Sequence, residues 1–330
     1  THRLAGAPVS ERIVIVGGGP AGLSAAIALA EAGLGDVTVH DREPEAGGIP
    51  RHTHHLGFGV RDRRRVMSGP AYARRLLASA QRAGVEVRTS SPVFERPDAD
   101  AVVLATGVRE RPRSARLVPG DRPAGVFTTG TLQQLADRKG RRVGDTAVIV
   151  GAEHVSFSAI WTLRSLGCRP VAMVTEHRRH QTTAALRLAT ATAHRMPLIT
   201  GRRVAEVTGL CRVESVVLDD GTRIDCDTVV FTGDWVPDHE LARHLGVPAQ
   251  PGSKAPTVDA EFHTAQRGVF AIGNLVHPAE TADVCALDGR RVVGAVAAFL
   301  RTGRWPEVAP ISVEPPLLWA SYAAGWLTVR

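Results

Sequence analysis

Cysteine is scarce in this sequence. The 330 residues include four cysteines, and no two of them form a CxxC pair or a zinc-binding spacing. No metal site is therefore predicted, and we expect a reducing, cytoplasmic compartment. Aromatic residues make up only 5% of the chain, so its cores must be built mainly from aliphatic side chains.

The chain also lacks a long uninterrupted apolar run. Glycines and a proline break the apolar stretch Ile13–Ala30, which favours a strand, a turn and a helix over a membrane span. Because a strand already begins within the first twenty residues, we expect no signal peptide.

Lysine is almost absent: Lys139 and Lys254 are the only two, so arginine carries nearly all of the positive charge behind the net charge of +7. The arginines are scattered, and no basic stripe is interleaved with aromatic residues, so we expect no nucleic-acid partner. The most compact cluster, Arg61–Arg65, is interpreted as a solvated loop face. A positive field would still favour an anionic cofactor.

What is present is a pair of similar segments. In the first, an apolar strand ends at Gly17-x-Gly19-x-x-Gly22, a helix follows, and a second strand ends at Asp41, 24 residues after Gly17. Gly17 permits a tight turn, Gly19 lets the backbone approach a pyrophosphate, and Gly22 lets the helix pack on the sheet. The free N–H groups of the helix would face the phosphates, and Asp41 would accept from a ribose.

The second segment repeats the strand, turn and helix with only its first glycine kept. It reads Gly151-x-Glu153-x-x-Ser156, and its second strand ends at Glu176, 25 residues after Gly151. Two matched strand–helix–strand units predict an α/β fold with two Rossmann-like domains.

Other segments complete the two expected sheets. Val85–Arg88, Ala101–Ala105 and Val269–Ile272 read as strands of the first domain. In the second domain, residues 204–224 read as a short antiparallel meander and residues 228–232 as a buried strand. Residues 281–300 read as a helix, whereas the tail from Trp305 to Arg330 has no clear pattern.

Further glycine-rich pieces point to FAD rather than NAD. The pieces follow one another along nearly the whole chain: Gly17–Gly22, Asp41-Arg42, Gly47-Gly48, Ala105–Gly107, Thr232–Asp234 and Gly273-Asn274. In this order they resemble the two-domain flavoproteins of the pyridine nucleotide–disulfide oxidoreductase superfamily. The resemblance implies two Rossmann-like, three-layer ββα domains, the second inserted in the first. It implies an FAD-binding domain made of residues 1–112 and 256–330, and an NAD(P)-binding-like domain made of residues 113–255. The resemblance implies that the Gly273 region holds the ribityl chain and phosphate of FAD, with Asn274 in place of the usual aspartate. It also implies that the helix beginning near Thr281 points at the flavin, where its N-terminus would stabilise the reduced ring.

The predicted FAD-binding residues are Gly17, Gly19, Pro20, Ala21, Gly22, Asp41, Arg42, Gly48, Ile49, Val93, Ala105, Thr106, Gly107, Gly273, Asn274, Thr281 and Ala282.

The redox cysteine pair of the disulfide-reducing relatives is missing. Neither residues 49–55 nor residues 126–131, where such pairs would stand, contain cysteine, and threonine cannot replace a thiolate in disulfide exchange. His52, His54 and His55 stand near the first of these places. They are candidates for a proton shuttle or a substrate ligand, or for hydrogen bonds to FAD or to the loop backbone.

The second nucleotide turn gives conflicting cues. Glu153 stands where a glycine should let a pyrophosphate approach, and its carboxylate would repel phosphate, whereas Ser156 is small enough. Glu176 could accept from a ribose, and Arg178 could receive a 2′-phosphate. NAD(P)H at Gly151, Glu153, Ser156, Glu176 and Arg178 therefore stays open, beside a scaffold that holds another adenine nucleotide or nothing.

A narrower resemblance concerns function. The run Gly47–Gly59, the segment Arg65–Ala73 and the run Gly151–Ser156 are similar to the flavoprotein subunits of opine oxidases, hydrogen cyanide synthase and dye-linked amino-acid dehydrogenases. Two departures stand out: residues 94–100 are too short for the family's β-meander, and no cysteine-rich iron–sulfur module follows at the C-terminus.

This branch implies oxidation of a small amine or amino acid by hydride transfer to flavin N5. It also implies that the chain functions in a complex with a second flavoprotein subunit and an iron–sulfur protein. Two alternatives stay open, an NAD(P)H-dependent reductase of a small molecule or partner protein, and a non-catalytic nucleotide-binding scaffold.

Overall fold

The computed structural model describes residues 10–140, 142–182, 196–315, 317, 319–323 and 326–329. The chain divides into two compact units. The first comprises the chain up to Arg51, Leu56–Val108 and everything from Val236 onward, and the second comprises His52–His55 and Arg109–Trp235. The second unit is thus inserted in the first, as the family resemblance implied.

The boundaries differ from those expected at residues 112 and 255. The chain returns to the first unit at Val236, well before residue 256. The reason is packing that no local pattern reveals: Leu241 and Ala242 are buried with Val16 and Leu104 of the first sheet. Burial of these apolar side chains draws the segment into the first unit.

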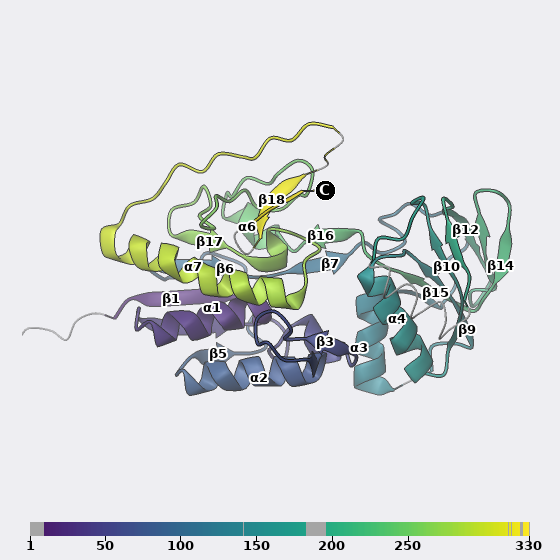
Figure 1. Ribbon diagram of the computed structural model, residues 1–330, viewed down its shortest axis with the longest axis horizontal. Coiled ribbons are helices and arrows are strands. Elements are labelled where there is room, and N and C mark those ends of the chain that lie inside the picture. Colours follow the sequence, from purple (N-terminus) through teal and green to yellow (C-terminus); the bar gives the residue numbers. More distant parts are fainter. Residues whose placement is uncertain are drawn as a thin grey trace, which may run out of the picture. The chain divides into compact units, whose positions relative to one another are not determined.

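The first unit is built on a parallel five-stranded sheet with the strand order β17-β6-β1-β2-β5. Its strands are β1 (Arg12–Val16), β2 (Asp36–His40), β5 (Glu86–Arg88), β6 (Ala101–Leu104) and β17 (Val269–Ala271). Three helices pack side by side, α1 (Pro20–Glu31), α2 (Gly69–Arg82) and α7 (Ala282–Thr302). Figure 1 shows α1 lying between α7 and α2.

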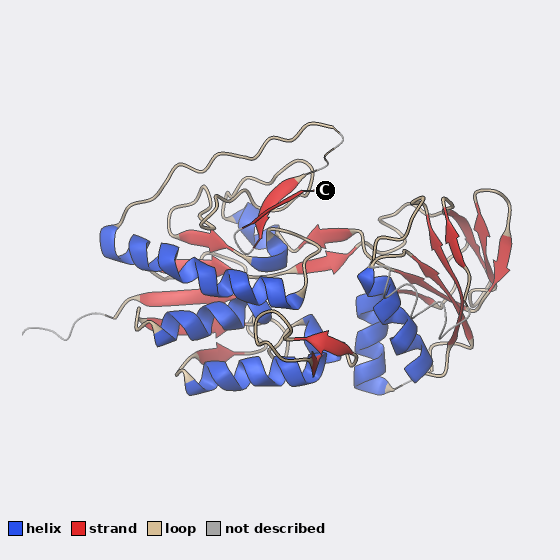
Figure 2. Cartoon of the chain, in the orientation of Figure 1, coloured by secondary structure: helices blue, strands red, loops and turns tan. Residues whose placement is uncertain are grey.

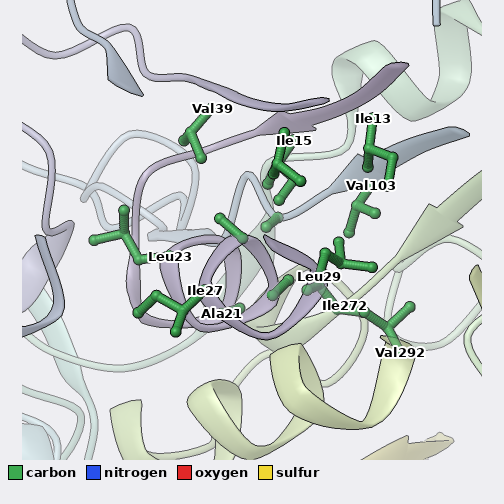
Figure 3. Close-up of a cluster of buried hydrophobic side chains, with 14 of the residues drawn as sticks. Ile13, Ile15, Ala21, Leu23, Ile27, Leu29, Val39, Val103, Ile272 and Val292 are labelled. Atoms are coloured by element: carbon green, nitrogen blue, oxygen red, sulfur yellow. The ribbon is translucent and has the colours of Figure 1, made fainter. Parts of the chain in front are cut away.

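A dry aliphatic core joins this sheet to the helix layer. Ile13 and Ile15 of β1 and Val103 of β6 meet Leu29 of α1 and Val292 of α7, all fully buried (Figure 3). The apolar residues of β1 and β6 run almost without polar interruption, as expected for parallel strands covered on both faces. A second cluster, around Val102 and Leu104, covers the other face.

Shorter elements complete the first unit. They are the 3-10 turns η1 (Ile49–His52) and η2 (Gly273–Leu275), the hairpin strands β3 (Leu56–Phe58) and β4 (Met67–Ser68), the helix α6 (Glu240–His244), and the strands β18 (Ala320–Ala323) and β19 (Trp326–Val329). The last two form an antiparallel pair in the tail that the sequence left unassigned. The two segments that connect the units, β7 (Val108–Glu110) and β16 (Trp235–Pro237), pair with each other.

The second unit has a parallel sheet of its own, with the strand order β11-β10-β9-β15-β8. Its strands are β8 (Val126–Thr128), β9 (Thr146–Val150), β10 (Arg169–Thr175), β11 (Leu198–Thr200) and β15 (Thr228–Phe231). The helices α3 (Thr129–Lys139) and α4 (His154–Ser165) pack together, and the strands β12 (Val204–Thr208), β13 (Ser215–Leu218) and β14 (Arg223–Asp225) form the expected meander.

Two cores make the second unit a three-layer structure. Leu132 of α3 and Ile160 of α4 pack with Ile149 of β9, while Val207 and Val216 of the meander are buried with Val148 of β9. Figure 2 shows that each unit contains both helices and strands. The predicted α/β class with two Rossmann-like ββα domains is confirmed. Across the ranges given above, the structure contains no helix that is both long and apolar enough to cross a membrane.

Candidate functional site

The glycines of the first turn leave only backbone atoms exposed where helix α1 begins. Gly17 has a φ of +111°, and a Cβ on it would lie 2.3 Å from the carbonyl oxygen of Ala105. A Cβ on Gly22 would lie 1.9 Å from the carbonyl oxygen of Gly17. Both positions therefore require glycine, as the motif predicted. At Gly19 the nearest atom to an added Cβ is the Cα of Gly48 at 3.9 Å, so the mouth of the turn is open.

The start of α1 is prepared for an anion. Gly19 is the N-cap residue and supplies no side-chain cap, Pro20 begins the helix, and its first turn contains no acidic residue. The first N–H groups of a helix have no partner within the helix and carry a partial positive charge. The open turn and the uncapped helix end together fit a diphosphate.

Asp41 lies at the end of β2 beside this turn. Its Oδ2 accepts a hydrogen bond from the Gly18 amide at 2.9 Å, and its Oδ1 accepts from the Glu43 amide at 2.9 Å. The residue is only 7% exposed, and burial raises the pKa of its carboxyl group. Each carboxylate oxygen keeps a second lone pair, so Asp41 can still accept from ribose hydroxyls.

The other predicted FAD residues of the first unit surround the turn or extend it. Gly48 packs on Gly19, because a Cβ on Gly48 would lie 3.0 Å from the Gly19 Cα. Gly273, with a φ of +68°, packs on Ala21 of α1. Gly107 has a φ of +77° and open space around it. Three glycines from distant parts of the chain thus leave backbone, not side chains, around the expected cofactor path.

Several predicted residues also have partners within the protein. Arg42 forms an ion pair with Asp238 at 2.8 Å, and Thr106 donates to the Asp238 carbonyl at 2.7 Å. Both ends of the Asn274 amide bond to the backbone of Glu280 at 3.0 Å, which closes the loop after η2. Asn274 therefore has a structural role in addition to the ribityl contact predicted for it.

The start of α7 is less positive than the sequence suggested. Thr281 is its N-cap residue and Ala282 its first residue, but Asp283 stands in the first turn. The Asp283 carboxylate accepts from the amides of Gly59 and Arg61 at 2.7 and 2.8 Å. Its negative charge offsets part of the helix potential that was expected to stabilise a reduced flavin.

In the second unit the equivalent turn is filled. Glu153 folds back so that its Oε2 accepts from the Ala152 amide at 2.9 Å. A Cβ on Gly151 would lie 2.8 Å from Oε2, and one on Gly233 would lie 2.6 Å from Oε1. The carboxylate thus lies in the glycine turn itself, where a diphosphate would need to approach.

The remaining residues of this turn are engaged or exposed. Ser156 Oγ accepts from the Glu153 amide at 3.2 Å and lies 2.6 Å from Thr232 Oγ1. Glu176 and Arg178 follow the end of β10 and are exposed to solvent. The ribose and phosphate contacts predicted for these two residues are sterically open, whereas the diphosphate contact is not.

The histidines predicted as catalytic candidates belong to the second unit. His52 Nδ1 lies 2.7 Å from Asp137 Oδ2, and His54 Nε2 lies 2.6 Å from Asp137 Oδ1. The His55 ring lies 5.0 Å from the Trp161 ring. The three side chains therefore anchor residues 52–55 on α3 and α4. Burial acts to raise the pKa of Asp137, but the hydrogen bonds from His52 and His54 and their charges together outweigh it and hold that pKa below its usual range.

Glu110 was not predicted from the sequence. It is 9% exposed, its Oε2 accepts from the Gly130 amide at 2.7 Å, and burial raises its pKa to about 7, with a smaller contribution from Glu153. Arg116, whose charge favours the ionised form, donates to the carbonyls of Thr232 and Gly233. No motif marks Glu110, because its burial arises from packing against α3.

None of the four cysteines is placed for a redox relay. Cys168, Cys226 and Cys285 are buried, Cys211 is exposed, and none is in a disulfide. Burial raises the pKa of Cys168 and of Cys226 to about 11 and that of Cys285 well above its ordinary value, so these thiols are poor nucleophiles. In the described part of the chain no cluster of three His, Cys, Asp or Glu side chains could hold a metal ion.

The family model for pyridine nucleotide-disulphide oxidoreductases matches residues 11–289, which include both glycine turns. The chain belongs to this family. Its members are FAD-dependent oxidoreductases with NAD(P)H as reductant, so the predictions of an FAD-dependent oxidoreductase and of FAD as its cofactor are confirmed at the level of the family. The open first turn, the uncapped α1 and the buried Asp41 fit that cofactor.

Individual relatives are distant. The chain is 26% identical over 332 residues to a protein assigned as the small chain of a glutamate synthase [NADPH] from Cereibacter sphaeroides, covering 88% of this chain and 77% of that one. It is 30% identical over 184 residues to the ferredoxin reductase component of chlorobenzene dioxygenase from a Cupriavidus strain, covering 53% of this chain and 43% of that one.

Thioredoxin reductase from T. acidophilum has the same fold. It superposes with a TM-score of 0.73 at 18% identity, covering 87% of this chain and 97% of that one. The family relationship rests on sequence, whereas this structural match establishes the two-domain fold alone.

Proposed function

We propose that this chain is an FAD-dependent oxidoreductase that takes electrons from a small amine or amino acid rather than from NAD(P)H or a dithiol. The observation that carries the proposal is the Glu153 carboxylate in the second glycine turn, 2.9 Å from the Ala152 amide. The half-buried Glu153 carboxylate at this point, whose Oε1 atom is buried, would repel the diphosphate of NAD(P)H and occupy its space. The absence of a cysteine pair removes the thiol route.

The first unit supplies the cofactor site. The N-terminus of α1 would hold the diphosphate of FAD, Asp41 would accept from its ribose, and the glycines at 48, 107 and 273 would leave room along its length. When bound, FAD supplies a two-electron acceptor for a hydride from a carbon that bears an amine. His52 and His54 are the candidate residues for holding or moving a proton, through the carboxylate of Asp137.

Partner proteins follow from the same proposal. Once reduced, the flavin needs an acceptor, and this chain has no cysteine cluster for an iron–sulfur centre. Two relatives are named as a small chain and as a ferredoxin reductase component. The narrower sequence resemblance to opine oxidase and amino-acid dehydrogenase subunits agrees with this picture. We therefore expect a second flavoprotein subunit and an iron–sulfur protein as partners.

A second candidate function is NAD(P)H-dependent reduction of a small molecule or a partner. It is favoured by the use of NAD(P)H in the family and by the exposed Glu176 and Arg178 at the end of β10. Under this alternative, NAD(P)H binds with its diphosphate displaced from the usual turn.

Anaerobic titration of the FAD-loaded protein separates the candidates. We expect the flavin absorbance to bleach with at least one member of a panel of amines and amino acids, and to respond at most slowly to NADH or NADPH. Rapid bleaching by NADPH alone would establish the second candidate instead. If no donor reduces the flavin, with or without partner subunits, the chain is a nucleotide-binding scaffold and the proposal is wrong.

A further inference from the structure

A basic cavity lies within the first unit, away from the glycine turn. It has a volume of about 650 Å³ and is lined by α1, α2, α7 and the turn at residues 62–65. Five arginines contribute to its wall: Arg63, Arg64, Arg65, Arg75 and Arg290. The wall also contains two carboxylates, those of Glu31 and Asp62, so its net charge is +3 when all of these groups are ionised. Figure 1 shows the three helices side by side.

Asp62 fixes two of these arginines. Its side chain is fully buried, and its Oδ2 lies 3.3 Å from Arg63 Nε and 3.3 Å from an Arg290 terminal nitrogen. Arg290 also donates to the Asp62 carbonyl at 3.1 Å. Because both guanidinium groups are held in place before a ligand arrives, less conformational entropy is lost on binding.

The turn that carries the arginines is itself anchored. The Asp283 carboxylate accepts from the amides of Gly59 and Arg61, and the Gly59 carbonyl accepts from those of Arg63 and Arg65. Arg64 is held at a φ of +51°, a strained conformation for a residue other than glycine. Such strain persists only where the surrounding structure imposes it, often at ligand-binding sites.

The other three arginines are uncompensated. Arg64, Arg65 and Arg75 are exposed and form no ion pair with any residue that the structure describes. Ser24 adds a buried hydroxyl on the wall that has no hydrogen-bond partner in the described structure. Ile27 and Ala28 of α1 supply an apolar part of the lining.

We propose that this cavity is a second anion site and binds a phosphorylated small molecule of nucleotide size. Guanidinium groups pair with phosphate through two parallel hydrogen bonds, and three uncompensated arginines match an anion of two or three charges. The volume falls within the usual range for small-molecule sites, and the apolar lining gives a base or ring a surface. The site shares no residue with the predicted FAD contacts.

Isothermal titration of the FAD-loaded protein tests the site with ADP, AMP, inorganic pyrophosphate and adenosine. We expect ADP and pyrophosphate to bind and adenosine not to bind. Substitution of both Arg65→Gln and Arg75→Gln should weaken ADP roughly a hundredfold, since each charged hydrogen-bonding pair lost costs roughly a factor of ten.

Two matched controls keep the result interpretable. Arg74→Gln removes an exposed arginine of α2 that does not line the cavity, and Arg178→Gln probes the second glycine turn. Both should leave ADP affinity unchanged. The proposal is overturned if no anion binds at low ionic strength, or if either Arg74→Gln or Arg178→Gln weakens ADP as much as the cavity pair does, since weakening by Arg178→Gln would place ADP at the second glycine turn instead. It is also overturned if an acidic peptide or an oligonucleotide binds more tightly than ADP.

Discussion

The Oε1 atom of Glu153 lies 2.6 Å from the position that a Cβ on Gly233 would take, so the two residues meet in the middle of the second nucleotide turn. Oε1 is buried and has no hydrogen-bond partner in the described structure, while Oε2 accepts from the Ala152 amide. The protein has thus placed its own anion at the start of α4, where a relative with glycine would hold a cofactor phosphate.

Replacing Glu153 should open the second turn. Glu153→Gly removes the charge and the side chain together, so we expect NADPH affinity to rise at least tenfold, measured by fluorescence titration. Glu153→Gln keeps the volume and loses only the charge, and it should give a smaller rise. Equal NADPH affinity in all three proteins would show that Glu153 does not block the turn.

Asp41 should control FAD retention. Asp41→Ala removes the carboxylate that we propose accepts from the ribose, and it leaves the Gly18 amide without its acceptor, so FAD should bind roughly 10- to 100-fold more weakly. Equilibrium dialysis of the flavin measures this. Asp36→Ala, at the exposed start of β2, is the matched control and should retain FAD normally. A fully loaded Asp41→Ala protein would exclude the proposed contact.

Glu110 should make stability depend on pH. Its folded pKa of about 7 lies above its ordinary value of 4.5, so the folded state holds a proton that the unfolded state releases. The resulting stabilisation is complete below pH 4.5 and is lost as the pH rises to about 7, by on the order of 3 kcal/mol.

The Glu110→Gln variant cannot ionise at this position. Chemical unfolding at pH 5 and pH 8 should therefore show a smaller loss of stability for the variant than for the parent protein. An identical loss in both proteins would mean that Glu110 does not titrate in this range.

The two histidines on Asp137 should contribute unequally. The His52 ring is 6% exposed and the His54 ring 64%, although their distances to the carboxylate are nearly the same. Solvent weakens exposed pairs, so double-mutant cycles with Asp137→Ala should give a coupling of about 1–3 kcal/mol for His52 and under about 1 kcal/mol for His54. Equal couplings would contradict this dependence on burial.

Much of the architecture was readable in the sequence because it depends on local chemistry. Gly17 and Gly22 each occupy a position where a Cβ would collide with backbone atoms. Such a turn therefore requires glycine at fixed intervals along the chain, and this spacing is recognisable as a sequence motif. Two similar domains were predicted from the unbroken apolar strands and from the recurrence of the strand–turn–helix segment. These features also depend only on short stretches of sequence. The absence of a redox cysteine pair is likewise visible in the sequence alone.

The tertiary structure decided which side chains meet. Asp137 reaches His52 across 85 positions of sequence, and Arg290 reaches Asp62 across 228. The basic cavity draws on four separated segments, and the sequence showed only the 61–65 cluster, interpreted as a solvated face. Glycine turns and strands are dictated by backbone sterics and hydrogen bonding over a few residues. Contacts such as these depend on how helices pack, and no local pattern records that.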